Sequence, residues 1–442
     1  PQVRLCLTAA SFLISYLMYA LDRRHKPLSV PLVARPLLAF ALVVVVTMLL
    51  RGGAGFGALG SSVGGAGRYV IVLGAIAGFF ALSARQIPLE KANLYIGLYL
   101  LGGLTLAISS LMPYTPHFLQ FIFMFFPVER LTGNEGFSFA QGQTRPYGVA
   151  VACMACLLYL LARWGVRGIF QTSKPWRIAL FLLLWAGIML GGYRSFILLG
   201  LGILVVQFYL EGLFTMRVLP GLLVIVTLFV AALPLVNRLP YQMQRSLAFL
   251  PVSVTQEVAV DTRASTQWRL EIWKRTIAEV PQYLLLGKGY ALDINDILHA
   301  MDRDRMGNRE VGESAQLAGD YHNGPLSIII PFGAFGMAAM IWFWVASWRL
   351  LLHNCRYGHP ELKVINTFLL AMFVTRVAQF IVIFGALATD LAYFVGIVGM
   401  SVALNGGLAR AQQTVPEVEP TPPPQRVRGL RSPLPPPAPF RT

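Results

Sequence analysis

The sequence predicts an all-α polytopic membrane protein, with about eleven or twelve transmembrane helices and one large, partly helical outer loop. Hydrophobic residues make up 56% of the 442 residues, and the mean hydropathy is +0.62. Only 13% of the residues are charged, compared with about 25% in soluble globular proteins. Apolar stretches of near-spanning length recur along most of the chain. In a bilayer we expect these to be helices, because a helical backbone satisfies its own hydrogen bonds.

The apolar stretches divide the chain into successive membrane-spanning segments. They cover residues 3–21, 36–50, 69–84, 94–112, 148–164, 177–192, 196–211, 218–236, 324–347, 364–385 and 386–404. The nearly continuous runs 177–211 and 364–404 are each too long to cross a bilayer of about 30 Å once. We therefore expect the first to turn at Gly191-Gly192 and the second near Gly385.

Basic residues recur in every second loop, and this bias predicts the orientation, because cytoplasmic loops are enriched in Lys and Arg. The basic loops contain Arg23, Arg24, Lys26 and Arg35; Arg85 and Lys91; Arg163, Arg167, Lys174 and Arg177; Arg217; and Arg349, Arg356 and Lys363. This pattern places residues 113–147 and 236–323 outside, together with the turn at Arg194, and the C-terminal tail inside. The sequence begins at Pro1 rather than Met, and we expect a further helix before it, which would make twelve spans and an inside N-terminus.

Six regions follow from this pattern. They are N-terminal transmembrane helices (1–112), an outer loop with an interfacial helix (113–147), helices around the Arg194 turn (148–235), the large outer loop (236–323), C-terminal helices (324–404) and a Pro-rich tail (405–442). The interfacial helix is predicted at 117–126, which is apolar but too short to span a bilayer. The tail should be disordered with polyproline II character, and its arginines should rest on the cytoplasmic leaflet.

Charge and cysteine content exclude several classes of function. The net charge of +16 does not indicate nucleic-acid binding, because the positive charges lie at the ends of apolar stretches, where topology and anionic lipids account for them. None of the four cysteines lies in the large outer loop, so no disulfide framework is predicted. Cys153-x-x-Cys156 falls inside an apolar helix, where small buried side chains are expected. The sequence shows no His/Cys/Asp cluster with metal-ligand spacing, which favours a reaction without a metal or other cofactor.

Two polar residues at the membrane boundary are candidates for chemistry. Arg194 lies between two apolar runs, where a charge must reach water, an anion or a partner. The alternative is an interfacial arginine that extends to the lipid headgroups. His322 lies beside Asn323 where the chain re-enters the membrane. A histidine there can act as a base or an anion ligand, or it can be a hydrated interfacial residue.

The large outer loop contains a helix-forming stretch at residues 267–280. An apolar stripe at helical spacing consists of Leu270, Trp273, Ile277 and Val280. Pro281 should end this helix. The helix could lie on the membrane surface with Arg269, Lys274 and Arg275 directed elsewhere; the alternative is a solvated basic face. The following Gly287-Lys288-Gly289-Tyr290 permits a tight turn but is far from a phosphate-binding loop.

Together these stretches resemble the O-antigen ligase and O-antigen polymerase superfamily. The matching elements are Gly192-Tyr193-Arg194-Ser195; Arg269-Leu270-Glu271-Ile272-Trp273; Leu286-Gly287-Lys288-Gly289-Tyr290; and His322-Asn323-Gly324-Pro325-Leu326 followed by Gly333-Ala334-Phe335-Gly336. The elements recur in the family's order over residues 190–340. A looser match is Arg145-Pro146-Tyr147-Gly148, which resembles an Arg-x-x-Gly element before a span.

The resemblance implies a membrane glycosyltransferase of GT-C architecture. Such enzymes transfer a glycan from an undecaprenyl pyrophosphate carrier on the periplasmic side of the bacterial inner membrane. Arg194 and Arg269 match positions that would grip the pyrophosphate, and His322 matches the family's essential histidine. Arg145, Lys288 and Asn323 belong to the matching elements and are further candidates for substrate binding.

The residue types suit these implied roles. Fixed arginines neutralise the developing charge of a pyrophosphate leaving group without a metal, and a histidine can serve as base or orient the attacking hydroxyl. Acidic residues of the large loop remain candidates for an auxiliary base. They are Asp302, Asp304, Glu310, Glu313 and Asp320.

Two versions of the reaction remain open. A polymerase would join O-antigen or exopolysaccharide repeat units, whereas a ligase would move the glycan to lipid A–core or to a protein. The implied partners are the lipid-linked donor, the glycan or lipid A–core acceptor, the bilayer and a chain-length regulator.

The competing hypothesis is a polysaccharide or lipid-linked oligosaccharide transporter or flippase. The ionisable candidates inside its late spans are Arg376 and Asp390, and Arg376 could pair with a carrier phosphate or with Asp390. Transporters usually show internal repeats, and none is evident between the halves of this chain. The large outer loop with its clustered motifs favours an enzyme.

Overall fold

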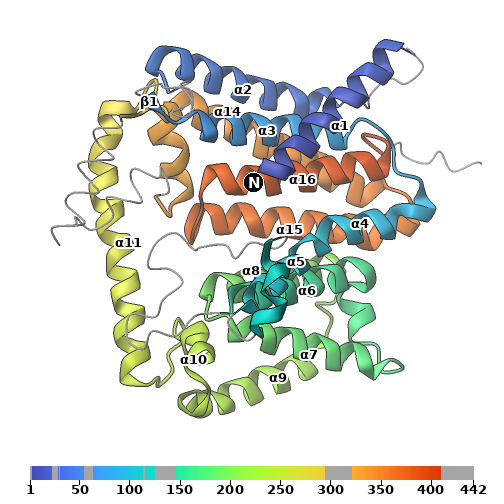
Figure 1. Cartoon of the computed structure of the whole chain (residues 1–442). Helices are drawn as coiled ribbons and strands as arrows, with labels where there is room; N and C mark the ends of the chain where they lie inside the picture. The colour runs from blue at the N-terminus through green and yellow to red at the C-terminus, as the bar shows by residue number, and fades with distance from the viewer. Residues whose placement is uncertain are drawn as a thin grey trace, which may run out of the picture. The chain divides into compact units, whose positions relative to one another are not determined.

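Helices make up nearly all of the regular structure in the computed structural model (Figure 1). The structure describes residues 2–21, 28, 30–53, 63–112, 115–124, 146–293 and 321–409. The unit described below comprises residues up to Ala409. The Pro-rich tail from Arg410 and the end of the first outer loop lie outside the described residues. So do the auxiliary-base candidates Asp302, Asp304, Glu310, Glu313 and Asp320.

The helices fall into three groups along the chain. The N-terminal ones are α1 (Gln2–Leu21), α2 (Pro31–Arg51), α3 (Ala66–Leu82), α4 (Ala92–Leu100), α5 (Thr105–Ser110) and α6 (Tyr147–Ile169). The central ones are α7 (Pro175–Leu190), α8 (Arg194–Leu210), α9 (Leu219–Ala232), α10 (Tyr241–Leu247) and α11 (Gln256–Tyr283). The C-terminal ones are α14 (Gly324–Tyr357), α15 (Lys363–Val382) and α16 (Leu387–Asn405).

Shorter elements connect these helices. The 3-10 helices are η2 (Leu89–Lys91), η3 (Leu101–Leu104), η5 (His117–Met124), η6 (Leu233–Arg238) and η7 (Pro360–Leu362). Strands β1 (Val63–Gly64) and β2 (Leu292–Asp293) form one short antiparallel pair, with Val63 opposite Asp293. This pair joins the start of α3 to the end of the segment that follows α11.

A helix is present at each stretch that was predicted to span the membrane, but not every one is long enough to qualify as a span. In the described part of the chain, 7 helical segments are long and apolar enough to cross a membrane: 31–51, 89–110, 147–169, 219–238, 324–357, 360–382 and 387–405. Shorter apolar helices cover 5–21, 66–82, 175–190 and 194–210. Together these segments account for every apolar stretch predicted from the sequence, so the all-α, multi-pass class is confirmed.

The core lies among the C-terminal helices. α14 packs against α2, α15 and α16; α15 packs against α6 and α8; and α16 packs against α3 (Figure 1). Phe343, Phe368 and Phe394, one from each of α14, α15 and α16, are fully buried. Many other large apolar side chains remain exposed on the outer faces, such as Leu42 and Leu183. In a membrane protein such faces contact lipid, so their exposure is expected.

The helix of the large loop differs from the prediction. α11 begins at Gln256 rather than near 267, and it continues past Pro281 to Tyr283. Pro281 lies so close to the helix end that the strain of a proline in a helix falls on the last turn. The apolar stripe also divides: Trp273 and Val280 pack against Tyr321, Leu326 and Ile330.

The other half of that stripe faces outward. Leu270 and Ile277 are 54% and 57% exposed, whereas Ile272 and Thr276 are fully buried. The buried face of α11 therefore differs from the predicted apolar stripe. The reason is that α11 packs against α10 and the first turns of α14. A single stripe along the whole helix was the wrong expectation.

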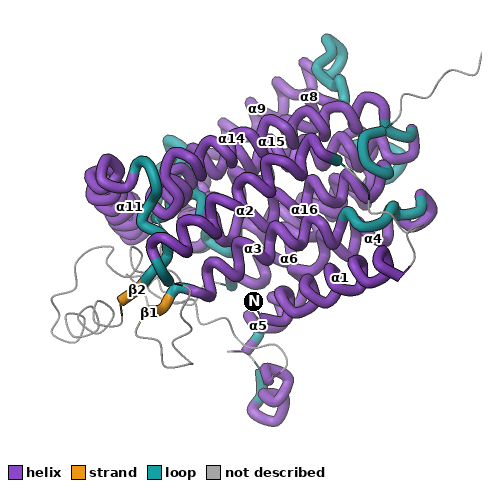
Figure 2. Tube along the Cα trace, turned by 90° about the horizontal axis from the view of Figure 1, so that it is seen from above, coloured by secondary structure: helices purple, strands orange, loops and turns teal. Residues whose placement is uncertain are grey.

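α11 lies across the ends of the membrane helices. In Figure 1 it runs nearly perpendicular to α2 and α15, and Figure 2 shows the same crossing from above. Contacts with α14 and α10 hold it there. If α14 and α15 cross the bilayer, then α11 runs close to the plane of the membrane.

α14 is broken at Gly333, whose φ of 65° and ψ of −164° are not helical. The segment after α11 takes over the hydrogen bonds that the break releases. Lys288 N donates to Ile330 O at 2.7 Å and Gly289 N donates to Pro331 O at 2.9 Å, while Ala334 N donates to Leu284 O at 2.6 Å. Broken helices are tolerated in membranes where protein satisfies the released backbone groups.

These backbone hydrogen bonds explain the glycines in two of the sequence motifs, residues 286–290 and 333–336. A Cβ on Gly287 would lie 2.1 Å from Pro331 O, and a Cβ on Gly333 would lie 2.3 Å from Leu285 O. Both glycines also have positive φ, near 69° and 65°. The chains can approach this closely only without side chains at these positions. We name these contacts between residues 284–289 and the break in α14 the α14 clamp.

Candidate functional site

Arg194 is the first residue of α8 and lies directly after the turn predicted at Gly191-Gly192. Gly192 has a φ of 74°, and a Cβ there would lie 2.6 Å from Gln242 Oε1. The turn is attached to α15, because Gln379 Nε2 donates to Ser195 O at 3.0 Å. These contacts fix the half-buried Arg194 at the end of the helix bundle where α10 and α11 lie.

Arg269 lies near Arg194 although the two are on different helices. It is a half-buried residue of α11. Burial disfavours the protonated Arg194 guanidinium most, the charges of Arg269 and Arg245 act in the same direction, and the charge of Asp261 opposes them. Three guanidinium groups and one carboxylate therefore share this region. Such an excess of positive charge favours the binding of an anion.

His322 lies beside the same helix. Its side chain is only 5% exposed, and its ring lies 5.1 Å from the ring of Trp268 and 5.0 Å from that of Phe384. Trp268 immediately precedes Arg269, so His322 packs against the turn of α11 that carries this arginine. Trp273 Nε1 also donates to Tyr321 O at 3.1 Å, which secures the turn to α11.

The backbone of His322 is strained. Its φ of 49° is the only positive value among the non-glycine residues that the structure describes. Such a conformation is uncommon outside glycine, and it persists where neighbouring contacts impose it. Here the two rings and the start of α14 supply those contacts.

Asn323 has a structural task at this point. Its Oδ1 accepts a hydrogen bond from Leu326 N at 3.1 Å, which caps α14 in the usual manner of an asparagine. Ser327 N donates to Asn323 O at 2.9 Å. The residue therefore fixes the position of His322 relative to α14. Its predicted contact with substrate stays a prediction.

Lys288 is exposed, and its ammonium lies 5.7 Å from the centre of the Tyr283 ring. Its backbone amide forms part of the α14 clamp. The structure thus places Arg194 near Arg269 and packs His322 against the turn of α11 that carries Arg269, and it gives the Lys288 motif a role in supporting α14. Arg145, the other predicted binding residue, lies outside the described residues.

The match to a known family covers this site. Residues 178–341 match the family model described as O-antigen ligase. The chain carries an O-antigen ligase domain. It extends from α7 to the first part of α14 and contains Arg194, Arg269 and His322. No curated protein matches the chain.

Two charged residues of the ligase domain went unnoticed in the sequence. Arg245 on α10 and Asp261 on α11 form a buried ion pair, with exposures of 7% and 2%. Tyr241 Oη donates to Asp261 Oδ2 at 3.0 Å, and Arg245 Nη1 donates to Gly192 O at 3.2 Å. No motif marks these positions. In sequence, they look like ordinary charged residues of a solvated loop.

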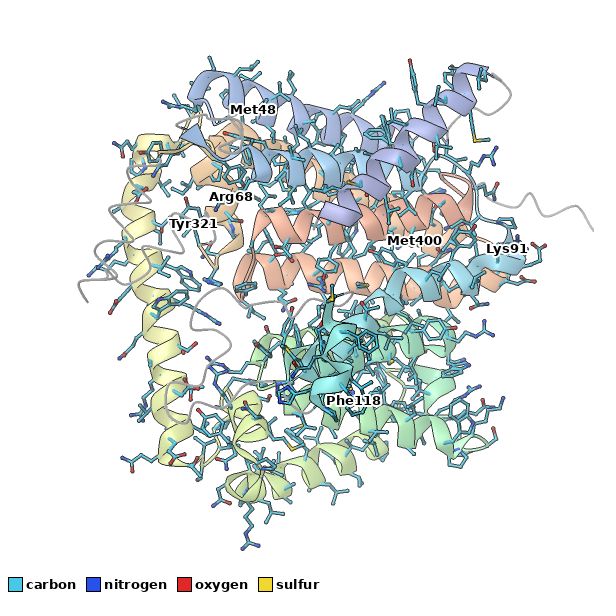
Figure 3. All side chains as sticks on the ribbon, in the orientation of Figure 1. Met48, Arg68, Lys91, Phe118, Tyr321 and Met400 are labelled. Atoms are coloured by element: carbon cyan, nitrogen blue, oxygen red, sulfur yellow. The ribbon has the colours of Figure 1, made fainter. Side chains whose placement is uncertain are left out.

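Tyr321 directly precedes His322 and lies beside the site. Its position between α11 and α14 is visible in Figure 3, with Arg68 nearby. Burial raises the pKa of the Tyr321 hydroxyl well above its usual range; the charge of Glu279 acts in the same direction and that of Arg68 in the opposite one. The hydroxyl therefore stays protonated near neutral pH and cannot serve as a base.

The ionisable pair in the late helices lies deeper along α15. Arg376 Nη1 is 3.8 Å from Asp390 Oδ1, and the Arg376 guanidinium lies 4.2 Å from the centre of the Tyr393 ring. Of the two partners expected for Arg376, the structure therefore has Asp390. Mutual pairing is how charges within a membrane are commonly accommodated.

Proposed function

We propose that the protein is a glycosyltransferase of the bacterial inner membrane that takes a glycan from an undecaprenyl pyrophosphate carrier on the periplasmic side. The observation that carries this proposal is the grouping of Arg194 and Arg269 beside the buried His322. Two neighbouring guanidinium groups repel each other, and a pyrophosphate with two negative charges would relieve that repulsion. The family match to O-antigen ligase supports the same substrate class.

The chemistry assigned to these residues is a displacement at the anomeric carbon of the donor sugar. The bond between that carbon and the pyrophosphate oxygen breaks, and the electron pair leaves with the carrier pyrophosphate. The hydroxyl oxygen of the acceptor forms the new bond and gives up its proton to His322. Arg194 and Arg269 stabilise the negative charge that develops on the leaving group. Because arginines perform this task, we expect no metal requirement.

The acceptor is a hydroxyl of a second carrier-linked glycan in a polymerase, or of lipid A–core in a ligase. Both reactions break the same bond in the donor, so the same residues serve either one. The orientation of α11 close to the membrane plane supports a site at the lipid–water boundary. There, a carrier can keep its tail in the bilayer while its sugar stays in water.

The test uses purified protein with an undecaprenyl-pyrophosphate-linked oligosaccharide in the presence of EDTA, with product length followed by gel. A ladder from the donor alone identifies a polymerase. Transfer that appears only after lipid A–core is added identifies a ligase. No transfer to either acceptor would count against the enzyme and in favour of transport.

The site assignment has its own test in the same assay. Changing Arg194, Arg269 or His322 to Ala should abolish the product while membrane insertion is retained. Arg217→Ala, in a loop predicted to be cytoplasmic, serves as the matched control and should keep full activity. Activity retained in all three site variants would contradict the assignment.

A further inference from the structure

The buried pair of Arg245 and Asp261 connects the segments that carry the two site arginines. Arg245 Nη1 bonds to Gly192 O at 3.2 Å, two residues before Arg194. Asp261 belongs to α11, about two helical turns before Arg269. The pair therefore spans from the start of α8 to α11 through α10. A shift of either segment would break one of its bonds.

The same short helix makes a second attachment to the turn. Ser246 Oγ donates to Met189 O at 2.8 Å, and Met189 lies in the last turn of α7. Adjacent residues of α10 thus bond to carbonyls on both sides of Gly191. α10 packs against α7, α8 and α11, so it lies at the junction of all three.

Burial makes this ion pair costly unless every group is satisfied. Removing a carboxylate and a guanidinium from water carries a desolvation penalty of several kcal/mol per ion. Here the Tyr241 hydroxyl and the Gly192 carbonyl supply additional hydrogen bonds. A buried pair of this kind is weak evidence for stability alone, so a role in fixing geometry deserves a test.

The electrostatics point in the same direction. Arg269 and Arg245 repel a charged Arg194, and Asp261 attracts it. Without substrate, repulsion would favour separation of α8 from α11. The carboxylate of Asp261 and the bond to Gly192 O oppose that separation. A binding site held in its bound geometry avoids part of the ordering cost of binding.

We propose that Arg245 and Asp261 are positioning residues that hold the Arg194 turn against α11 and so preset the spacing of Arg194 and Arg269 for a pyrophosphate. This inference rests on the proposed function. It assigns no contact with the substrate to either residue; both act through Arg194.

The experiment measures the affinity of purified protein for farnesyl pyrophosphate, a short isoprenoid pyrophosphate, by isothermal titration calorimetry. We expect Arg245→Met and Asp261→Ala each to weaken binding about tenfold or more, because the turn loses its attachment. Asp261→Asn keeps an oxygen that can accept from Tyr241 and Arg245. It should therefore bind more tightly than Asp261→Ala, but more weakly than the wild type because it loses the charge that attracts Arg194.

The matched control is Arg177→Met. Arg177 is also a buried arginine that donates to a backbone carbonyl, Gly168 O at 2.8 Å, but it lies at the other end of α7. Its substitution should leave the affinity unchanged. Equal weakening by Arg177→Met and Arg245→Met would mean that general destabilisation explains the result, and would overturn the proposal.

A double-mutant cycle separates positioning from direct binding. If Arg245 acts through Arg194, then Arg245→Met should cause no further loss of affinity in an Arg194→Ala background. The same tenfold loss in both backgrounds would show that Arg245 acts on the ligand independently, and would overturn the positioning role.

Hydrogen–deuterium exchange separates failure of this inference from failure of the proposed function. We expect faster exchange at residues 190–196 in Arg245→Met but not in Arg177→Met. If the wild type does not bind farnesyl pyrophosphate, the proposed function is contradicted, and the exchange result alone decides whether the pair holds the turn. Unchanged exchange at 190–196 in Arg245→Met would overturn the inference in either case.

Discussion

At the scale of single residues, His322 is held between two aromatic rings. Trp268 and Phe384 lie against it at 5.1 and 5.0 Å, and its backbone has a φ of 49°. An acceptor hydroxyl that approaches this imidazole would meet a side chain with few alternative rotamers. The tryptophan is therefore as relevant to the proposed chemistry as the motif residues.

Trp268→Ala should lower the turnover number by at least about tenfold, because misplacement of a reacting group by about 1 Å can cost that much or more. Trp268→Phe keeps an aromatic contact and should retain most of the activity. The measurement is the transfer assay with the lipid-linked donor, accompanied by the melting temperature of each variant. Full activity in Trp268→Ala would show that the ring contact does not orient His322.

Tyr321 gives a prediction about pH. An unfolded tyrosine ionises near pH 10, and burial raises the pKa of Tyr321 above that value. Below pH 10 both states keep the proton, so the difference has no effect. Above pH 10 the unfolded state ionises first, and the stability of the fold decreases. Thermal unfolding between pH 8 and 11 should show a smaller decrease for Tyr321→Phe than for the wild type. The same decrease of melting temperature with pH in both proteins would contradict a raised pKa of Tyr321.

In the sequence, Arg194 and His322 stand out as polar residues beside apolar runs, whereas Arg269 stands out only through the resemblance to the O-antigen ligase family. Their mutual proximity depends on tertiary structure. Arg245 and Asp261 escape sequence reasoning, because burial there results from how α10 packs between α7 and α11. The roles assigned to all five residues stay predictions until binding and transfer are measured.

At the scale of elements, hydropathy predicts the membrane helices well because lipid requires long apolar helices. The large loop is less predictable. The start of α11 at Gln256 and its inward face at Ile272 and Thr276 are set by contacts with α14, which no local pattern encodes. The break at Gly333 was likewise visible only as part of a motif.

The α14 clamp can be tested through its glycines. Gly287→Ala should destabilise the protein by at least about 1–2 kcal/mol, the cost of a left-handed backbone for an L-residue, with a further penalty because its Cβ would lie 2.1 Å from Pro331 O. Gly67→Ala is the control, since a Cβ at Gly67 meets nothing within 4 Å. The measurement is the melting temperature in detergent. Equal values for both variants would contradict a clamp.

At the scale of the whole molecule, the orientation is the assumption on which the proposed reaction depends. The basic loops predict that the α11 end faces outward. Lys288 and Arg356 are both exposed and lie on opposite sides of α14 along the chain. Labels attached at these two positions therefore show which end of α14 faces which side of the membrane.

In whole cells, a membrane-impermeant maleimide should label Lys288→Cys directly and Arg356→Cys only after permeabilisation, in a background without the native cysteines. The positive-inside rule gives the expected direction. Labelling of Arg356→Cys alone in intact cells would reverse the orientation and exclude a periplasmic site.

The contacts of α15 bear on when the site can form during synthesis. Gln379 at the end of α15 holds the Arg194 turn, and Phe384 just beyond it lies against His322. Membrane helices are inserted in chain order, so α8 and α11 are in place before either contact exists. The surroundings of the Arg194 turn and of His322 would then remain incomplete until Phe384 has been synthesised. A nascent chain arrested before this point would be inserted without the contacts of α15 and Phe384 to these two residues.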